Sequence, residues 1–207
     1  MLIPTEGITT MPEITSPEEA VQLAIDAIQF TRRILANGNC NPYEGVPGTE
    51  FKSPEMIVLE EVQKMRDHPI VVDPGDSIRH TLCRAKVAMG AKCGNCGEYA
   101  AVAFAYLFAR GASPIMLASY PNSTWDHCFV IIGPQGKPGS VICDPWADLY
   151  CSLEIRDRWK EHIWGDEVPP DDGASVLTLV EDDCGGPDAY NSLTQDQTTY
   201  DAMDMSF

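Results

Sequence analysis

The sequence predicts one α+β domain in which N-terminal helices and a central helix pack on a small antiparallel sheet. Helix-start signals recur in the first half of the chain, an alanine-rich apolar run follows over residues 99–110, and short apolar runs separated by turn residues come after it. Strands that follow helices in this way favour the α+β class. A chain of 207 residues is long enough for one hydrophobic core and too short for two full domains.

Three helices are predicted before the apolar run. Residues 16–19, Ser-Pro-Glu-Glu, combine an N-cap, a proline in the first helical position and a capping-box glutamate, so they begin a helix that runs to about Leu35. Residues 38–52 are rich in glycine, proline and asparagine, which predicts a loop. A second Ser-Pro pair begins a helix over 53–67, and a third helix follows over 77–90.

The apolar run over 99–110 predicts a helix that is buried on all sides. Cys96 therefore lies at or just before the start of this helix. The elements expected after it are strands over 114–120, 127–132 and 141–144, a short helix over 156–164 and a last strand over 176–180. The second and third of these strands are expected to be antiparallel neighbours, because the turn-rich connection between them is short.

Charge is spread unevenly along the chain. The formal net charge is −17, and residues 166–207 carry 11 of the 31 acidic side chains and none of the 14 basic ones. We therefore expect a single folded domain over 1–165 and an acidic, partly disordered C-terminal segment over 166–207. Nucleic acids and anionic membranes repel such a charge, so neither is an expected partner.

The sequence contains no apolar run near the roughly 18 to 20 residues that a membrane-spanning helix needs. The first eleven residues lack the basic start and apolar stretch of a signal peptide. We therefore expect a chain that is not membrane-bound and is cytoplasmic, or is secreted or injected without a cleavable signal peptide. The eight cysteines are then expected to be free thiols in a reducing compartment.

Three residues lie where a cysteine-based catalytic triad needs them. The start of a buried helix lowers the pKa of a thiol, and Cys96 has that position. His127 opens an apolar strand, from which its ring can point at the helix start. Asp144 ends the neighbouring strand and can fix the tautomer of the imidazole. We therefore expect helix start, strand start and strand end to converge on one cleft, with Cys96 as the nucleophile.

The same residues match the pattern of a known family over 92–150. Gly-Asn-Cys ahead of an alanine-rich helix, a Gly-x-x-Pro break at 111–114, His127 at a strand start and Asp144 followed by proline together resemble the core of transglutaminase-like cysteine enzymes. The resemblance implies a papain-like α+β fold. It also implies a Cys-His-Asp triad, which carries over to Cys96, His127 and Asp144.

Members of this superfamily hydrolyse peptides, deamidate glutamine or cross-link glutamine to amines, and several bacterial toxins and injected effectors use the same core. The resemblance thus implies a catalytic domain over 1–165 that attacks amide carbonyls of a protein substrate through a thioester, as a cysteine protease, deamidase or transglutaminase. Such chemistry requires no cofactor. Asn95 and Trp125 are candidates for binding the substrate or the oxyanion. The negative charge favours a protein substrate with a neutral or basic surface.

A zinc-binding interaction module is the alternative. Cys93 and Cys96 have the Cys-x-x-Cys spacing of zinc ligands, and His127, Cys128 or Cys143 could complete the set. Against this, a second closely spaced ligand pair is missing, so we expect no metal site. The Cys-x-x-Cys spacing also allows a redox motif, in which the first cysteine normally lies at the helix start. On the enzyme interpretation, Cys93 is a packing thiol.

Overall fold

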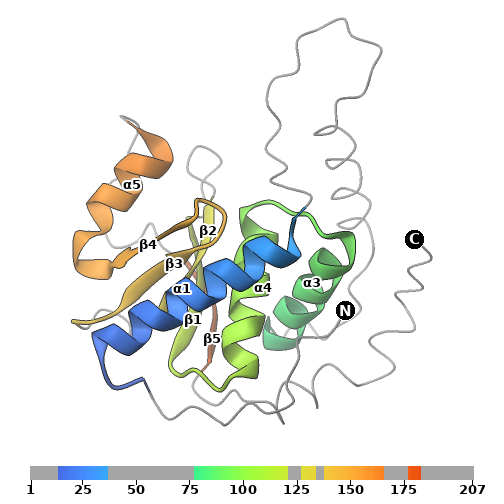
Figure 1. Ribbon diagram of the computed structural model, residues 1–207, viewed down its shortest axis with the longest axis horizontal. Helices are drawn as coiled ribbons and strands as arrows, with labels where there is room; N and C mark the ends of the chain where they lie inside the picture. Colours follow the sequence, from blue (N-terminus) through green and yellow to red (C-terminus); the bar gives the residue numbers. More distant parts are fainter. Residues whose placement is uncertain (1–13, 37–76, 121–126, 134–137, 166–176, 183–207) are drawn as a thin grey trace, which may run out of the picture.

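Five antiparallel strands make one sheet through the middle of the described structure (Figure 1). The computed structural model describes residues 14–36, 77–120, 127–133, 138–165 and 177–182. The order along the sheet is β4-β3-β2-β1-β5, and every neighbouring pair is antiparallel. The strands are β1 Ile115–Tyr120, β2 His127–Ile132, β3 Val141–Asp144, β4 Leu149–Ser152 and β5 Leu177–Asp182.

Helices cover both faces of this sheet. On one face, α4 lies between α1 and α3, and α5 covers the opposite face (Figure 1). The helices are α1 Pro17–Ile34, α3 Ser77–Ala91, α4 Cys96–Ala109 and α5 Arg156–Trp164, and a short 3-10 helix, Leu153–Ile155, precedes α5. No described helix is both long enough and apolar enough to span a membrane. The predicted α+β class, with helices packed on a small antiparallel sheet, is confirmed.

The pairing register brings the end of β1, the start of β2 and the end of β3 to the same end of the sheet. Tyr120, the last residue of β1, lies opposite His127, the first residue of β2. Val130 of β2 lies opposite Cys143 of β3, and Asp144 is the next residue of β3. The predicted antiparallel pairing of β2 and β3 is therefore confirmed. It brings the start of β2 and the end of β3 to one place.

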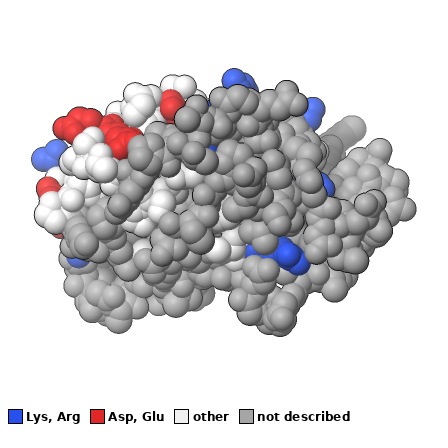
Figure 2. Space-filling model, turned by 90° about the horizontal axis from the view of Figure 1, so that it is seen from below, with Lys and Arg blue, Asp and Glu red and all other residues white. Residues whose placement is uncertain are grey.

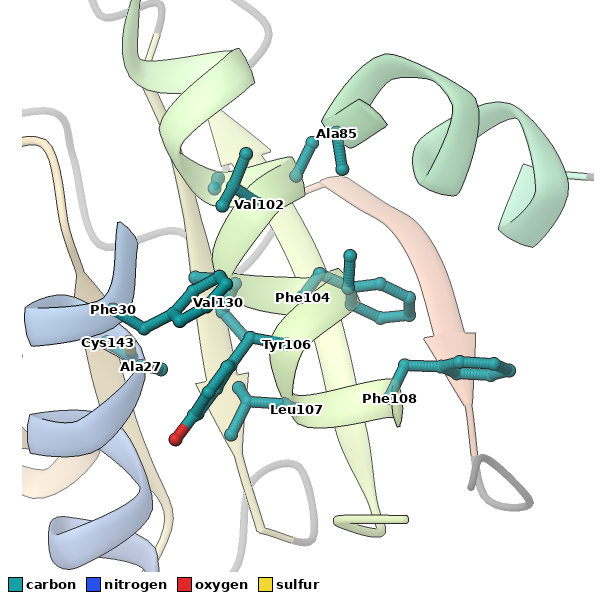
Figure 3. Close-up of a cluster of buried hydrophobic side chains, with 14 of the residues drawn as sticks. Ala27, Phe30, Ala85, Val102, Phe104, Tyr106, Leu107, Phe108, Val130 and Cys143 are labelled. Carbon is teal, nitrogen blue, oxygen red and sulfur yellow. The ribbon is translucent and has the colours of Figure 1, made fainter. Parts of the chain in front are cut away.

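Helix α4 is the centre of the main core. Every residue from Gly97 to Ala109 is buried, which explains why the helix has no polar face. Figure 3 shows its two sides: Tyr106 points toward Phe30 of α1, and their rings stack with centroids 4.6 Å apart. Val102 lies near Ala85 of α3 in the same view. The many alanines let both helices approach closely, so α4 has little freedom to shift along the sheet.

Strand β4 is an element that the sequence pattern does not predict. It returns beside β3 after a tight turn in which Asp148 adopts a positive φ of 61°. Its four residues are half-buried or exposed. A strand this short, without a buried apolar alternation, gives no clear periodic signal.

Several expected elements lie outside the described residues, among them the helix over 53–67 and the loop over 38–52. Strand β5, at Leu177–Asp182, corresponds to the strand expected over 176–180 and pairs with β1. The sheet therefore extends beyond residue 165 and takes an edge strand from the acidic segment over 166–207.

Candidate active site

The start of α4 is held by a buried carboxylate. Asn95 is the N-cap residue, with extended backbone angles, and its N–H donates a hydrogen bond to Oε2 of Glu98 at 2.9 Å. Glu98 is fully buried, and its Oε1 lies 3.6 Å from Nε of Arg84 on α3. These contacts fix the first turn of α4, and Cys96 is the first residue of that turn.

Glycines on both sides of Cys96 allow this close packing. A Cβ atom at Gly94 would collide with Cβ of Glu98, so this position needs a residue without a side chain. A Cβ atom at Gly97 would lie 3.4 Å from Nη1 of Arg84 and 3.9 Å from Sγ of Cys128. Gly94 is therefore sterically required, whereas the flexible end of Arg84 leaves some room at Gly97.

His127 lies in an aromatic pocket at the start of β2. Its side chain is 4% exposed, and its ring contacts Trp146 edge-on with centroids 5.3 Å apart. Trp164 of α5 makes a similar contact at 6.0 Å, and Phe129 stacks at 6.4 Å. The indole and phenyl rings restrict the imidazole to one orientation and exclude water from most of it.

Asp144 accepts hydrogen bonds from three directions. Nε2 of His127 lies 2.8 Å from Oδ2 of Asp144, and Nε1 of Trp159 donates to the same oxygen at 2.9 Å. The backbone N–H of Ala147 donates to Oδ1 at 3.1 Å. The Asp144 side chain is fully buried, and these donors replace the water it would otherwise bind.

Trp159 is a component of this site that the sequence analysis missed. It belongs to α5, on the face of the sheet opposite α4, and it is 3% exposed. The signal that could have singled it out is a large aromatic residue within a short and otherwise polar helix. Such a residue must be buried against something, and an indole buried beside a carboxylate donates its N–H to it.

Cys96 and His127 form a strongly coupled pair. A hydrogen bond from the Cys128 side chain is the largest influence on the pKa of Cys96 and lowers it. Burial acts in the opposite direction, but the hydrogen bond and charge of His127, with the backbone of Cys128, lower the pKa further. The result is a thiol whose pKa is well below its ordinary value, so the thiolate exists at neutral pH.

The pKa of His127 moves in the complementary direction. Burial is the largest single influence and lowers it, but hydrogen bonds to Asp144 and Cys96 and the charges of both groups together raise it above its ordinary value. Because Nε2 faces Asp144, Nδ1 is the nitrogen left to face the sulfur of Cys96. The site thus favours a thiolate beside an imidazolium, the form in which a cysteine nucleophile attacks.

The structure brings Cys96, His127 and Asp144 together, as expected. Asn95 lies directly beside them, and its Oδ1 is buried without a hydrogen-bond partner among the described residues. Trp125 lies outside the described residues, as does its neighbour Asp126.

The zinc alternative gains no support from this geometry. Cys93 is 2% exposed and belongs to the main hydrophobic core. Within the described ranges, no three cysteine, histidine, aspartate or glutamate side chains gather in a metal-binding arrangement. All five ligands suggested for zinc, Cys93, Cys96, His127, Cys128 and Cys143, belong to those ranges, so the spacing of Cys93 and Cys96 does not translate into a shared site.

No protein-family model matches the chain, and neither a curated protein nor a solved structure matches it. What the site can do must therefore follow from its own residues.

The coupled pair predicts selective alkylation of Cys96 by iodoacetamide in mildly acidic solution. Thiolate and imidazolium coexist between the pKa values of about 4 for Cys96 and about 9 for His127. The rate at pH 6 should stay within about twofold of the rate at pH 8, whereas an ordinary thiol slows by about 100-fold. Peptide mapping by mass spectrometry gives the rate for each cysteine.

Cys151 is the internal control for this measurement. It is also half-buried, but burial and then the charge of Asp144 raise its pKa to about 11. It should stay unmodified at pH 6 while Cys96 is alkylated. A Cys96 rate that falls tenfold per pH unit below pH 8 would contradict the assignment of the coupled pair.

The packing of Gly94 predicts a sharp difference between two alanine variants. Gly94→Ala forces Glu98 away from the N–H of Asn95, and it should destabilise the fold by about 2 to 3 kcal/mol through overpacking and loss of the helix cap. Gly97→Ala should lower the free energy of unfolding by less than about 1 kcal/mol, because only the flexible end of the Arg84 side chain must move. Urea unfolding compares them, and equal losses would refute the assigned role of Gly94.

The Trp159 hydrogen bond predicts that Trp159→Phe, which keeps a ring but removes the N–H, slows alkylation of Cys96 at pH 6 by about tenfold. The reason is that Asp144 then holds His127 less firmly. Trp164→Phe is the matched control, since Trp164 contacts the same imidazole, whereas the hydrogen bonds that Asp144 accepts within the described residues come from His127, Trp159 and Ala147. It should stay within about twofold of the parent rate. Equal effects of the two variants would show that ring packing alone matters.

Proposed function

We propose that this chain is a thiol enzyme that attacks amide carbonyls of a protein substrate, with Cys96 as nucleophile, His127 as acid and base, and Asp144 as the group that orients His127. The observation that carries the proposal is the continuous hydrogen-bonded series from Cys96 through His127 to Asp144, whose last contact measures 2.8 Å. A nucleophile, a base and an orienting carboxylate in this order are the parts that covalent acyl transfer needs.

The reaction proceeds in two halves. The Cys96 thiolate attacks the carbonyl carbon, and the resulting oxyanion collapses to a thioester as His127 gives its proton to the departing amine or ammonia. His127 is then neutral and can take a proton from water, or from an amine, that attacks the thioester. Attack by water gives hydrolysis or deamidation, and attack by an amine gives a cross-link.

The oxyanion that forms in each half needs hydrogen-bond donors near Cys96. The first N–H groups of an α-helix have no acceptor within the helix, and Cys96 and Gly97 supply such groups at the start of α4. The carboxamide of Asn95, the residue before Cys96, is a side chain of suitable chemistry, and its buried oxygen has no partner within the described residues. A turn of this amide group about its last bond would present N–H groups to the substrate. Trp125 remains the second candidate for this task.

The arrangement of elements also supports a papain-like or transglutaminase-like domain. In the proposal, the nucleophile comes from the start of a central helix, the histidine from the start of one strand and the aspartate from the end of the next. This is the order in which the motifs of that superfamily occur along the chain. His127 and Asp144 belong to neighbouring antiparallel strands, so the sheet sets the distance between them.

Charge supports a neutral or basic protein as the substrate. The chain has a formal charge of −17. On the face shown in Figure 2, the Lys and Arg side chains of the described residues are scattered, while Asp and Glu side chains gather near one end. A polyanionic substrate such as nucleic acid would be repelled. Attraction to a basic protein would raise the association rate and weaken as salt increases.

Intact-mass analysis of candidate proteins distinguishes the possible reactions. Casein-type and glutamine-rich test proteins are incubated with the enzyme, with and without a small primary amine. Deamidation adds about 1 Da per site, cross-linking adds the amine with loss of ammonia, and proteolysis gives fragments. Cys96→Ala is the control for the nucleophile, and Cys93→Ala is the control for a nearby buried thiol. If Cys96→Ala retains the activity, the proposal is wrong.

The role of Asp144 predicts that Asp144→Asn reduces kcat by roughly 10² to 10⁴ with little change in KM. An amide in place of the carboxylate also removes a hydrogen bond and a charge that raise the pKa of His127. The alkaline limit of the pH–activity profile should therefore move to lower pH, because the imidazolium loses its proton earlier. If the alkaline limit of the pH–activity profile does not move in Asp144→Asn, Asp144 does not raise the pKa of His127 as proposed.

A further inference from the structure

Cys128 is a second thiol at the site, and the proposed amide chemistry uses it only as a hydrogen-bond donor to Cys96 and not as a nucleophile. It follows His127 in β2, and the two side chains point to opposite faces of the sheet, as neighbours in a strand do. His127 lies with the aromatic rings near α5, whereas Cys128 packs against the core beneath α4. The two residues thus approach Cys96 from different sides, and both side chains make hydrogen bonds with it.

The position of Gly97 also places the Cys128 sulfur at the first turn of α4. A Cβ atom at Gly97, the residue after Cys96, would lie in ordinary van der Waals contact with Sγ of Cys128, at 3.9 Å. Neither cysteine is in a disulfide, and both residues are half-buried. By contrast, Cys93 is almost fully buried, although it lies nearer to Cys96 in the sequence.

We propose that Cys96 and Cys128 form a peroxide-sensitive pair in which Cys96 is oxidised first and Cys128 is the resolving thiol. The proposal does not rest on the amide chemistry, since it needs only the adjacency of the two sulfurs and access for a hydroperoxide. It assigns to Cys128 a role as a modification site, with hydrogen peroxide or a small organic hydroperoxide as the oxidant.

The chemistry takes two steps. In the first, the Cys96 thiolate attacks one oxygen of the peroxide, the O–O bond breaks, and Cys96 becomes a sulfenic acid, while the other oxygen leaves after protonation as water, or as an alcohol when the oxidant is an organic hydroperoxide. In the second, Cys128 gives up its proton and attacks the sulfenic sulfur, the S–O bond breaks, and a molecule of water leaves. Two electrons pass from the two sulfurs to the peroxide, and an added dithiol reverses the reaction.

Formation of this disulfide would remove the nucleophile and protect it at the same time. Cys96 in a disulfide cannot attack an amide, and it cannot proceed to sulfinic acid, which is irreversible in most proteins. Oxidation would therefore switch off the thiol chemistry reversibly.

Peptide mapping of the full-length protein after brief treatment with hydrogen peroxide tests the proposal. The expected product is a chain lighter by about 2 Da with a reducible cross-link between the peptides that contain Cys96 and Cys128. In Cys128→Ser this cross-link is absent, and Cys96 should gain two oxygens, about 32 Da, at least tenfold faster than in the parent protein. Cys93→Ala should still form the Cys96–Cys128 cross-link.

Two controls keep the result decisive. Thermal unfolding shows whether each variant is folded, and Cys128→Ala serves if Cys128→Ser is not. A disulfide between Cys96 and Cys93, or equal rates of overoxidation in the parent and the folded Cys128 variant, would overturn the proposal. Either result would leave the amide chemistry untouched, because that is measured on reduced protein with Cys96→Ala as its control.

Discussion

The buried carboxylate of Asp144 is the constraint on which the rest of the site depends. A carboxylate removed from water must find hydrogen-bond donors, and here they come from three separate elements: His127 of β2, Trp159 of α5 and the backbone N–H of Ala147 after β3. Satisfying it therefore fixes the orientation of the imidazole and the position of α5 together. After the hydrogen bond from the Cys128 side chain, the largest influence that lowers the pKa of Cys96 is this histidine, which Asp144 holds and keeps charged.

A second, independent constraint places the sulfur. The start of α4 is determined by Glu98, which binds the N–H of Asn95 and pairs with Arg84. Tight packing of α4 against its neighbours then prevents the helix from sliding. The histidine is positioned by the sheet and the cysteine by the helix, so their distance is set by how α4 rests on β2. Such a site tolerates little adjustment, and this rigidity suits a reaction whose atoms must meet in one geometry.

The sequence predicts the triad residues because each lies at the end of an element, and element ends have local signals. Gly94 and the alanine-rich run mark the start of α4, and apolar runs mark β2 and β3. Other features depend on how distant elements dock, which local patterns do not encode. Trp159 acquires its partner only when α5 covers the second face of the sheet. By sequence Cys128 is a candidate zinc ligand, yet its side chain makes a hydrogen bond with Cys96, because the packing of α4 on β2 brings the two together. Strand β4 forms because the turn at Asp148 returns the chain beside β3, and its own sequence has no apolar periodicity that would predict it.

The docking of α5 also links the reactivity of the thiol to the order in which the chain is made. Synthesis delivers Cys96, His127 and Asp144 before Trp159, so a nascent chain can assemble β1 to β3 while the buried carboxylate still lacks its indole donor. Until that helix arrives, Asp144 remains open to water and His127 to motion, and the sulfur behaves more like an ordinary thiol. The low pKa of the Cys96 thiol is therefore reached only after α5 has docked on the sheet. A chain in which α5 has not yet docked would carry at Cys96 a thiol of nearly ordinary reactivity.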